Sequence, residues 1–347
     1  MVKAYGLGKV TAYKYVIDNK EIFLDFGSRN ITQSDIKNVD YIFITHEHLD
    51  HWEMLLKYEL VKELNPKCEI YATKTTKELI QFLAIERIKK YSYKEEAYNY
   101  IINIINNIKS CLLKKEYELS DTLKFTLFRS GHTFGSSMIY IKSNTKKILY
   151  TGDFDYIKKN FNRQYDLPYG LEVDELIVDG TNLVKNFYKG IKLDDIRSYV
   201  LRHNEASYYV RPEKAVFYAQ YFLDHIEDCI FIYTKDMNQY LQIISSNGYN
   251  PYVEDKIMYE ESLDILKHRY VNKKIIRFTT NPNDYLLDTK LSLHITTNEL
   301  KKFIDDKFIV YPKHILIGHF DLKEQKSLNI QGIKNTFLLK DGENHYD

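Results

Sequence analysis

Cysteine, net charge and long apolar runs are all scarce in this chain of 347 residues. Its three cysteines, Cys68, Cys111 and Cys229, form neither a disulfide framework nor a Cys-x-x-Cys ligand pair. Lysine and arginine total 49 against 48 aspartates and glutamates, so any basic surface for nucleic acid has to be local. No apolar run is long enough to span a bilayer, and the N-terminus shows no signal-peptide pattern. We therefore expect a cytoplasmic protein with no membrane partner.

The composition is otherwise that of a globular protein. Hydrophobic residues make up 44% of the chain and charged residues 28%, which is ordinary for a soluble domain. The length allows a sizeable core, in one large domain or two smaller ones.

The most informative stretch is the sequence THEHLDH at residues 45–51. It follows an apolar run that predicts a buried strand, so the polar cluster lies at the end of a strand. Alternation in an extended segment places His46 and His48 on the same side, while Asp50 and His51 follow where the chain bends. Imidazole nitrogen and carboxylate oxygen are ligands that suit zinc, manganese or iron. A solvated, histidine-rich turn is the alternative, but this spacing at a strand end favours a metal site.

More polar residues stand beside glycine at the ends of predicted strands. Asp153 and Asp179 each end a strand beside glycine, and Asp25 ends one just before a glycine turn. His132 follows a strand and is flanked by glycines. Asp25 is either a turn former or a group that orients a metal-binding histidine through its other ring nitrogen. His132 taken alone is either part of a packed turn or a ligand. Because strand after strand ends in histidine or aspartate, we expect these side chains on one edge of a sheet.

The remaining pattern predicts mixed α/β structure. Residues 54–64 and 75–90 have the spacing of helices, and residues 93–118 predict one or two more. Strand–helix alternation from about residue 188 to residue 284 indicates a small α/β insertion. An apolar strand at 315–317 then ends in Gly318-His319.

These motifs resemble those of the metallo-β-lactamase fold superfamily and, within it, of the β-CASP nucleases. The superfamily resemblance is carried by residues 25–27, 45–51, 131–136 and 150–154, and so covers about the first 160 residues. The narrower resemblance rests on the threonine-rich stretch at 71–79, on Asp179-Gly180-Thr181, on Ser292-Leu293-His294 and on residues 312–319.

The resemblance implies an α/β fold, a four-layer αβ/βα sandwich formed by residues 1–185 and 286–347, with a shortened β-CASP-like lobe at residues 186–285. It also implies two divalent metal ions, with zinc expected and manganese as the alternative. Seven residues would hold the ions: His46, His48 and His132 the first, Asp50, His51 and His319 the second, and Asp153 both.

The resemblance further implies a catalytic set. Asp179 and His294 match β-CASP positions that assist protonation of the leaving group. Asp50 is assigned to the same catalytic set. A histidine oriented by a carboxylate is suited to act as a general acid.

The implied function is that of a metal-dependent ribonuclease or RNA-processing phosphodiesterase. RNA is favoured because RNA-directed members tend to carry a histidine at the position of His319. The first alternative is a hydrolase of the same fold that acts on DNA or on a small phosphodiester, lactone or thioester, which the near-neutral charge favours. The second is a non-catalytic scaffold of a processing complex, but that class usually lacks ligands, and here all seven positions are intact.

Overall fold

A computed structural model describes residues 2–6, 9, 11–91, 93–156, 165–183, 193–202, 205–226, 229–250, 257–259, 274–279, 285–286, 294–320, 323, 328 and 330–345. The chain forms two compact units. The first comprises Met1–Lys158, Arg163–Phe187 and Leu293–Asp347, and the second Lys159–Asn162 and Tyr188–Ser292. The assignment of residues 186–285 to a β-CASP-like lobe stays a prediction.

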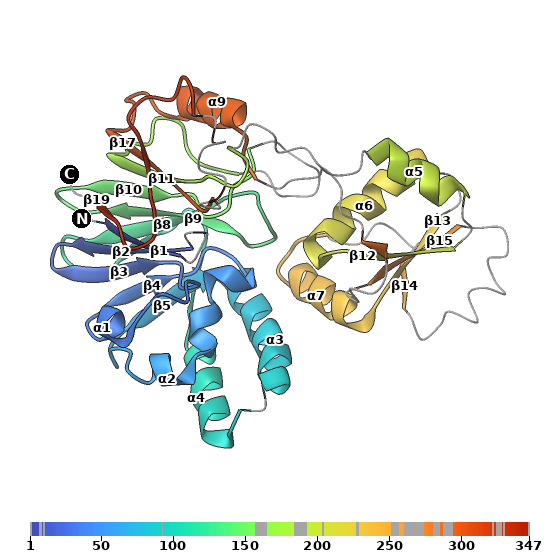
Figure 1. The fold of residues 1–347 in the computed structure, drawn as a ribbon, viewed down its shortest axis with the longest axis horizontal. Coiled ribbons are helices and arrows are strands. Elements are labelled where there is room, and N and C mark those ends of the chain that lie inside the picture. Colours follow the sequence, from blue (N-terminus) through green and yellow to red (C-terminus); the bar gives the residue numbers. More distant parts are fainter. Residues whose placement is uncertain are drawn as a thin grey trace. The chain divides into compact units, whose positions relative to one another are not determined.

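In the first unit, the described strands form two seven-stranded sheets (Figure 1). The first sheet has the order β19 (Asn344–His345), β1 (Val2–Tyr5), β2 (Ala12–Ile17), β3 (Lys20–Leu24), β4 (Tyr41–Phe43), β5 (Glu69–Thr73) and β6 (Lys109–Cys111). The second sheet has the order β18 (Thr336–Leu338), β17 (His314–Gly318), β11 (Glu175–Asp179), β10 (Lys147–Tyr150), β9 (Ser137–Lys142), β8 (Lys124–Arg129) and β7 (Glu116–Glu118).

Helices cover the outer face of each sheet (Figure 1). Those on the first sheet are α1 (Gln33–Ile36), α2 (Tyr58–Val61), α3 (Lys74–Tyr91) and α4 (Glu95–Asn106), and α9 (Thr297–Lys307) lies on the second. Two neighbouring residues of β4 point to opposite faces of the first sheet. Ile42 packs in the same cluster as Ile101 of α4, whereas Phe43 packs in the cluster between the two sheets. The ring of Phe43 meets that of Phe125 from the second sheet, with centroids 4.8 Å apart. Phe303 of α9 belongs to a third cluster on the far side of the second sheet. The predicted four-layer sandwich is confirmed.

Strand register brings distant polar residues together. Strands β11 and β17 pair in parallel with Asp179 opposite Gly318, so His319 lies beside Asp179 although 140 residues separate them. Strands β3 and β4 are also parallel, with Leu24 opposite Phe43. The residues that follow each strand therefore meet at one edge of the sandwich.

The second unit contains a parallel sheet of five described strands. Their order is β14 (Ile257–Tyr259), β13 (Cys229–Tyr233), β15 (Lys274–Thr279), β12 (Glu205–Tyr209) and β16 (Tyr285–Leu286). Helices α5 (Leu193–Arg202), α6 (Pro212–His225) and α7 (Lys235–Ser246) alternate with these strands in the chain. Such alternation is what parallel strands need, since each crossover has to return the chain to the same end of the sheet.

Two predicted helices differ from the structure. Residues 54–64 contain only the 3₁₀ turn η2 (Glu53–Leu56) and the single turn α2 instead of one helix. The helical prediction over 93–118 is right for α4 but wrong beyond it, where the short strands β6 and β7 follow. Both strands lie at sheet edges and are only three residues long. Lys109 of β6 and the two glutamates of β7 carry little β propensity, so pairing with a neighbour decides the conformation of these strands.

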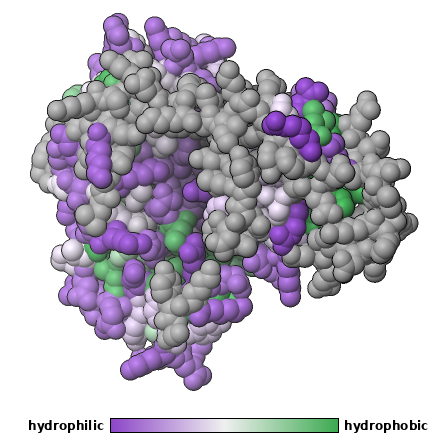
Figure 2. Space-filling model, turned by 45° about the vertical axis from the view of Figure 1, so that its right-hand side comes forward, coloured by the Kyte–Doolittle hydropathy of each residue, from purple (hydrophilic) through white to green (hydrophobic). Residues whose placement is uncertain are grey.

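No helix in the described part of the chain combines the length and apolar character that a bilayer crossing needs. On the face shown in Figure 2, the described residues present mainly hydrophilic surface with small, separate hydrophobic spots.

Gly27 allows the turn after β3 to pack against the backbone of Asp50, because a Cβ at residue 27 would lie 1.6 Å from the Asp50 carbonyl oxygen. We predict that Gly27→Ala lowers the unfolding temperature of the first unit by about 5–10 °C, since the clash is with backbone that cannot rotate away. Calorimetry tests this, with Asn38→Ala as the control, because Asn38 is exposed in a turn of the same unit. Equal, small shifts in both variants would contradict the close packing.

Candidate metal centre

The THEHLDH sequence forms the loop that leaves the end of β4. His46 is fully buried after the strand, and the 3₁₀ turn η1 (Leu49–His51) then reverses the chain. This turn buries His51 but leaves the side chain of Asp50 50% exposed. The structure therefore confirms that the cluster lies at the end of a strand.

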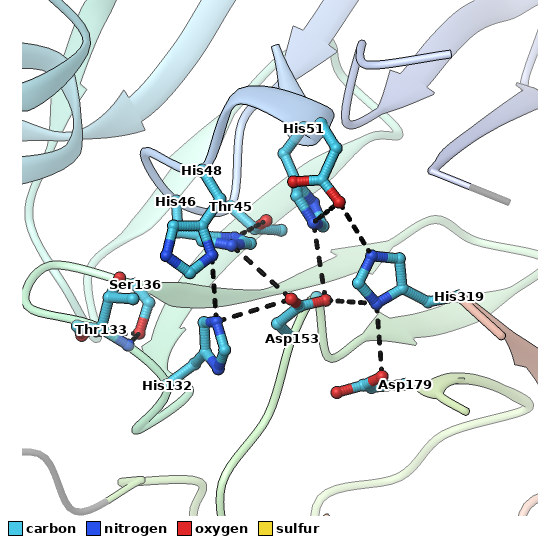
Figure 3. A network of polar contacts seen from close by, with 12 residues as sticks. Thr45, His46, His48, His51, His132, Thr133, Ser136, Asp153, Asp179 and His319 are labelled. Carbon is cyan, nitrogen blue, oxygen red and sulfur yellow. Dashed lines mark hydrogen bonds and ion pairs between the residues drawn. The ribbon is translucent and has the colours of Figure 1, made fainter. Parts of the chain in front are cut away.

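Three histidines and one carboxylate form a first group of possible ligands. The ligand atoms of His46, His48, His132 and Asp153 all lie within 4.8 Å of one another. His132 Nε2 is 3.2 Å from His48 Nδ1, and Asp153 Oδ2 is 3.5 Å from His132 Nε2. The same oxygen is 3.7 Å from His46 Nε2 (Figure 3).

A second group lies on the other side of Asp153. It consists of Asp50, His51 and His319, whose ligand atoms also lie within 4.8 Å of one another. Asp153 Oδ1 is 3.5 Å from His51 Nε2 and 2.7 Å from His319 Nδ1. In Figure 3, Asp153 accordingly lies between His46 and His132 on one side and His51 and His319 on the other. The structure thus brings together all seven predicted ligands, and the two carboxylate oxygens of Asp153 face different groups.

Two observations indicate that the seven candidate ligands suit divalent metal ions. Among the described residues, the buried Nε2 atoms of His46, His51 and His319 find no hydrogen-bond partner, an arrangement that costs about 1–3 kcal/mol per group unless a ligand satisfies it. Two atoms that bind one ion at about 2.1 Å in a tetrahedron are about 3.4 Å apart, close to the 3.5–3.7 Å that separate Asp153 from His46, His51 and His132. This donor set of imidazoles and carboxylates suits zinc or manganese.

The electrostatics of the cluster also suit ligand binding. Burial, together with His51 and His48 nearby, holds the pKa of His46 well below its usual value, so its ring is neutral. Burial alone would raise the pKa of Asp153, but His319 and His51 hold it well below its usual value. Burial would lower the pKa of His319, but Asp153 raises it well above its usual value. Because a ligand histidine has to be neutral, the protonated form of His319 would compete with a metal ion at the second group.

Asp25 contacts a histidine of the second group, as its predicted orienting role requires, and that role stays a prediction. This buried carboxylate accepts a hydrogen bond from His51 Nδ1 at 2.7 Å, which turns the other ring nitrogen of His51 toward the second group. It also accepts the hydroxyl of Tyr150 at 2.7 Å. The Thr45 hydroxyl donates to Asp25 at 2.8 Å and lies 3.0 Å from His46 Nδ1. Since its only proton goes to Asp25, Thr45 accepts from His46 Nδ1–H, and one carboxylate positions histidines of both groups.

The loop that carries His132 is held by threonine hydroxyls. Thr73 and Thr76 both donate to the carbonyl oxygen of Gly135, at 2.7 and 3.0 Å. The Thr133 hydroxyl donates to the buried carboxylate of Glu47 at 2.7 Å. These contacts give the threonine-rich stretch at 71–79 a structural role that the sequence motif alone does not reveal.

Asp179 and His294 form a hydrogen-bonded pair beside the centre. His294 Nδ1 lies 2.5 Å from Asp179 Oδ2 and 3.8 Å from Asp153 Oδ2. Burial alone would raise the pKa of Asp179, but the neighbouring His294 lowers it, so the carboxyl is ionised. Asp179 is buried, whereas the side chain of His294 is 19% exposed. Ser292 and Leu293 of the same motif lie outside the described residues.

Comparison with known proteins agrees with this geometry. The model of a family described as the metallo-beta-lactamase superfamily domain matches residues 16–177. This segment belongs to the metallo-beta-lactamase superfamily. The matched segment contains the ligand positions from His46 to Asp153, while Asp179, His294 and His319 lie beyond it.

Relatives that match part of this chain include named ribonucleases. The RNase J-like protein of Methanocaldococcus jannaschii is 32% identical over 168 residues, which cover 46% of this chain and 37% of the relative. The endoribonuclease YSH1 of Mycosarcoma maydis is 29% identical over 157 residues, 44% of this chain and 18% of that protein. The matches thus span well under half the length of these curated relatives. The resemblance predicted from the motifs, to this superfamily and to ribonucleases within it, is confirmed.

One solved structure matches nearly the whole chain. A protein of unknown function from Enterococcus faecalis V583 has a TM-score of 0.62 at 13% identity, covering 99% of this chain and 98% of its own. At this identity, the comparison shows that the two proteins share a fold and shows nothing about function.

The contacts of the Thr45 hydroxyl with Asp25 and His46 can be tested by substitution. We predict that Thr45→Val weakens metal binding about 10–100-fold, because His46 loses the acceptor that fixes its protonated nitrogen. Thr45→Ser is the matched control and keeps wild-type affinity, since it retains the hydroxyl. Calorimetric titration with zinc measures both, and equal losses in the two variants would show that packing of the methyl group matters instead.

Proposed function

We propose that this chain is a metal-dependent phosphodiesterase of the β-CASP type that cleaves RNA and uses two divalent ions, with zinc as the expected metal. The observation that carries the proposal is the position of Asp153 between two groups of ligands, next to the Asp179–His294 pair. The named ribonucleases among the relatives support RNA as the substrate. Because all three cysteines are free thiols, we also propose that the protein works in the reducing cytoplasm.

The seven ligand residues would hold the ions: His46, His48 and His132 the first, Asp50, His51 and His319 the second, and Asp153 both. When bound, two such ions lower the pKa of a water molecule and neutralise charge on the phosphoryl oxygens. Asp50 is the half-exposed member of the set, so its carboxylate stands where substrate enters and can take the proton of the attacking water.

The Asp179–His294 pair supplies the proton for the leaving group. His294 Nδ1 donates to the ionised Asp179, and this contact fixes the orientation of the imidazole ring. With Nδ1 bound in this way, His294 Nε2 is the atom that gives its proton to the departing ribose oxygen.

Cleavage of labelled RNA by the zinc-loaded protein tests the substrate. We expect RNA to be cut faster than single-stranded DNA, bis-p-nitrophenyl phosphate or a lactone. Faster turnover of DNA or the lactone would instead support the second candidate, a different hydrolase on this fold, which the net charge of +1 favours.

Asp153→Ala should abolish turnover and lower the bound metal from two ions to one or none, because its carboxylate would contact both ions and keep their repulsion small. Elemental analysis of the purified variant measures the metal content, with Asp121→Ala in an exposed turn as the control. Two ions and wild-type turnover in Asp153→Ala would rule out the shared carboxylate.

His294→Ala should reduce kcat on RNA by roughly 10²-fold or more and leave metal content unchanged, since His294 acts on the leaving oxygen. The loss should shrink on an aryl phosphodiester, whose leaving group barely needs a proton. The exposed His225 on α6 provides the control substitution. Equal losses on both substrates, or loss of metal, would mean that His294 is not the general acid.

A further inference from the structure

A lysine lies beside the exposed ligand of the second group. Lys9 Nζ is 3.7 Å from Asp50 Oδ2, and the two side chains are 36% and 50% exposed. Lys9 therefore places a positive charge on the solvent side of the Asp50–His51–His319 group.

The ion pair with Asp50 does not by itself explain why a lysine lies beside the centre. An exposed pair at this separation contributes about 0–1 kcal/mol, so it adds little to the stability of the fold. Once Asp50 binds a divalent ion, its charge is neutralised and a neighbouring ammonium is repelled by the ion. An anion in front of the centre removes this repulsion, and a lysine on its flexible stem can reach such an anion.

We propose that Lys9 binds the phosphate of the substrate at the Asp50 side of the centre and so selects a phosphodiester over a neutral ester. This inference rests on the proposed function and names the substrate-binding residue. A neutral lactone or thioester gains nothing from the ammonium, whereas a phosphate oxygen gains a charge-assisted hydrogen bond.

The experiment compares Lys9→Met and Lys9→Arg with a matched control. Lys20 is also 36% exposed and also pairs with an aspartate, Asp40, but it lies where β3 begins, at the opposite end of the strand from Asp25. Calorimetry on the zinc-loaded proteins measures the affinity for inorganic phosphate. Elemental analysis gives the metal content, and KM and kcat are measured on bis-p-nitrophenyl phosphate.

We expect Lys9→Met to weaken phosphate binding about tenfold or more and to raise KM similarly, because a hydrogen bond to a charged group is lost. Its metal content and kcat should stay close to wild type, and Lys9→Arg and Lys20→Met should bind phosphate normally. Wild-type phosphate affinity in Lys9→Met overturns the proposal. So does loss of metal, which would mean that Lys9 acts on Asp50. If the wild-type protein cleaves no phosphodiester but Lys9→Met still loses phosphate affinity, the proposed function fails and the phosphate site stands.

Discussion

The buried carboxylate of Asp153 is the constraint on which the rest of the centre depends. A charge in this position is costly unless it is paired, and here five histidines surround it while Asp179 lies close by. Its two oxygens face opposite ways, so the histidines fall into two groups rather than one. Divalent cations are the partners that satisfy this arrangement of ionised carboxylates and buried ring nitrogens.

The two-sheet architecture explains how such a cluster is assembled. The first sheet supplies Asp25 and the THEHLDH loop, while the second supplies His132, Asp153, Asp179 and His319. Neither sheet holds a complete ligand group, because His132 completes the first and His319 the second. The apolar layer between the sheets, in which Phe43 meets Phe125, therefore sets the spacing of the ligands. Packing of the core and the geometry of the centre are properties of the same interface.

Much of this could be predicted from the sequence, since ligands at strand ends leave a local pattern. The seven candidate ligands and the Asp179–His294 pair are recognisable in the sequence as histidine and aspartate beside glycine or after apolar runs. The contacts of Tyr150 with Asp25 and of Lys9 with Asp50 leave no such pattern, because they depend on which residues the fold places opposite one another. The strands β6 and β7 were missed for a similar reason, as tertiary pairing overrides their weak propensity.

The central claim is that Asp153 lies between two metal ions, and anomalous diffraction at the zinc absorption edge from a zinc-soaked crystal tests it most directly. The account predicts two peaks, one in contact with His46, His48 and His132 and the other with Asp50, His51 and His319. A single peak, or a peak held by Asp179 and His294, would contradict it, because the pair would then bind metal instead of donating a proton.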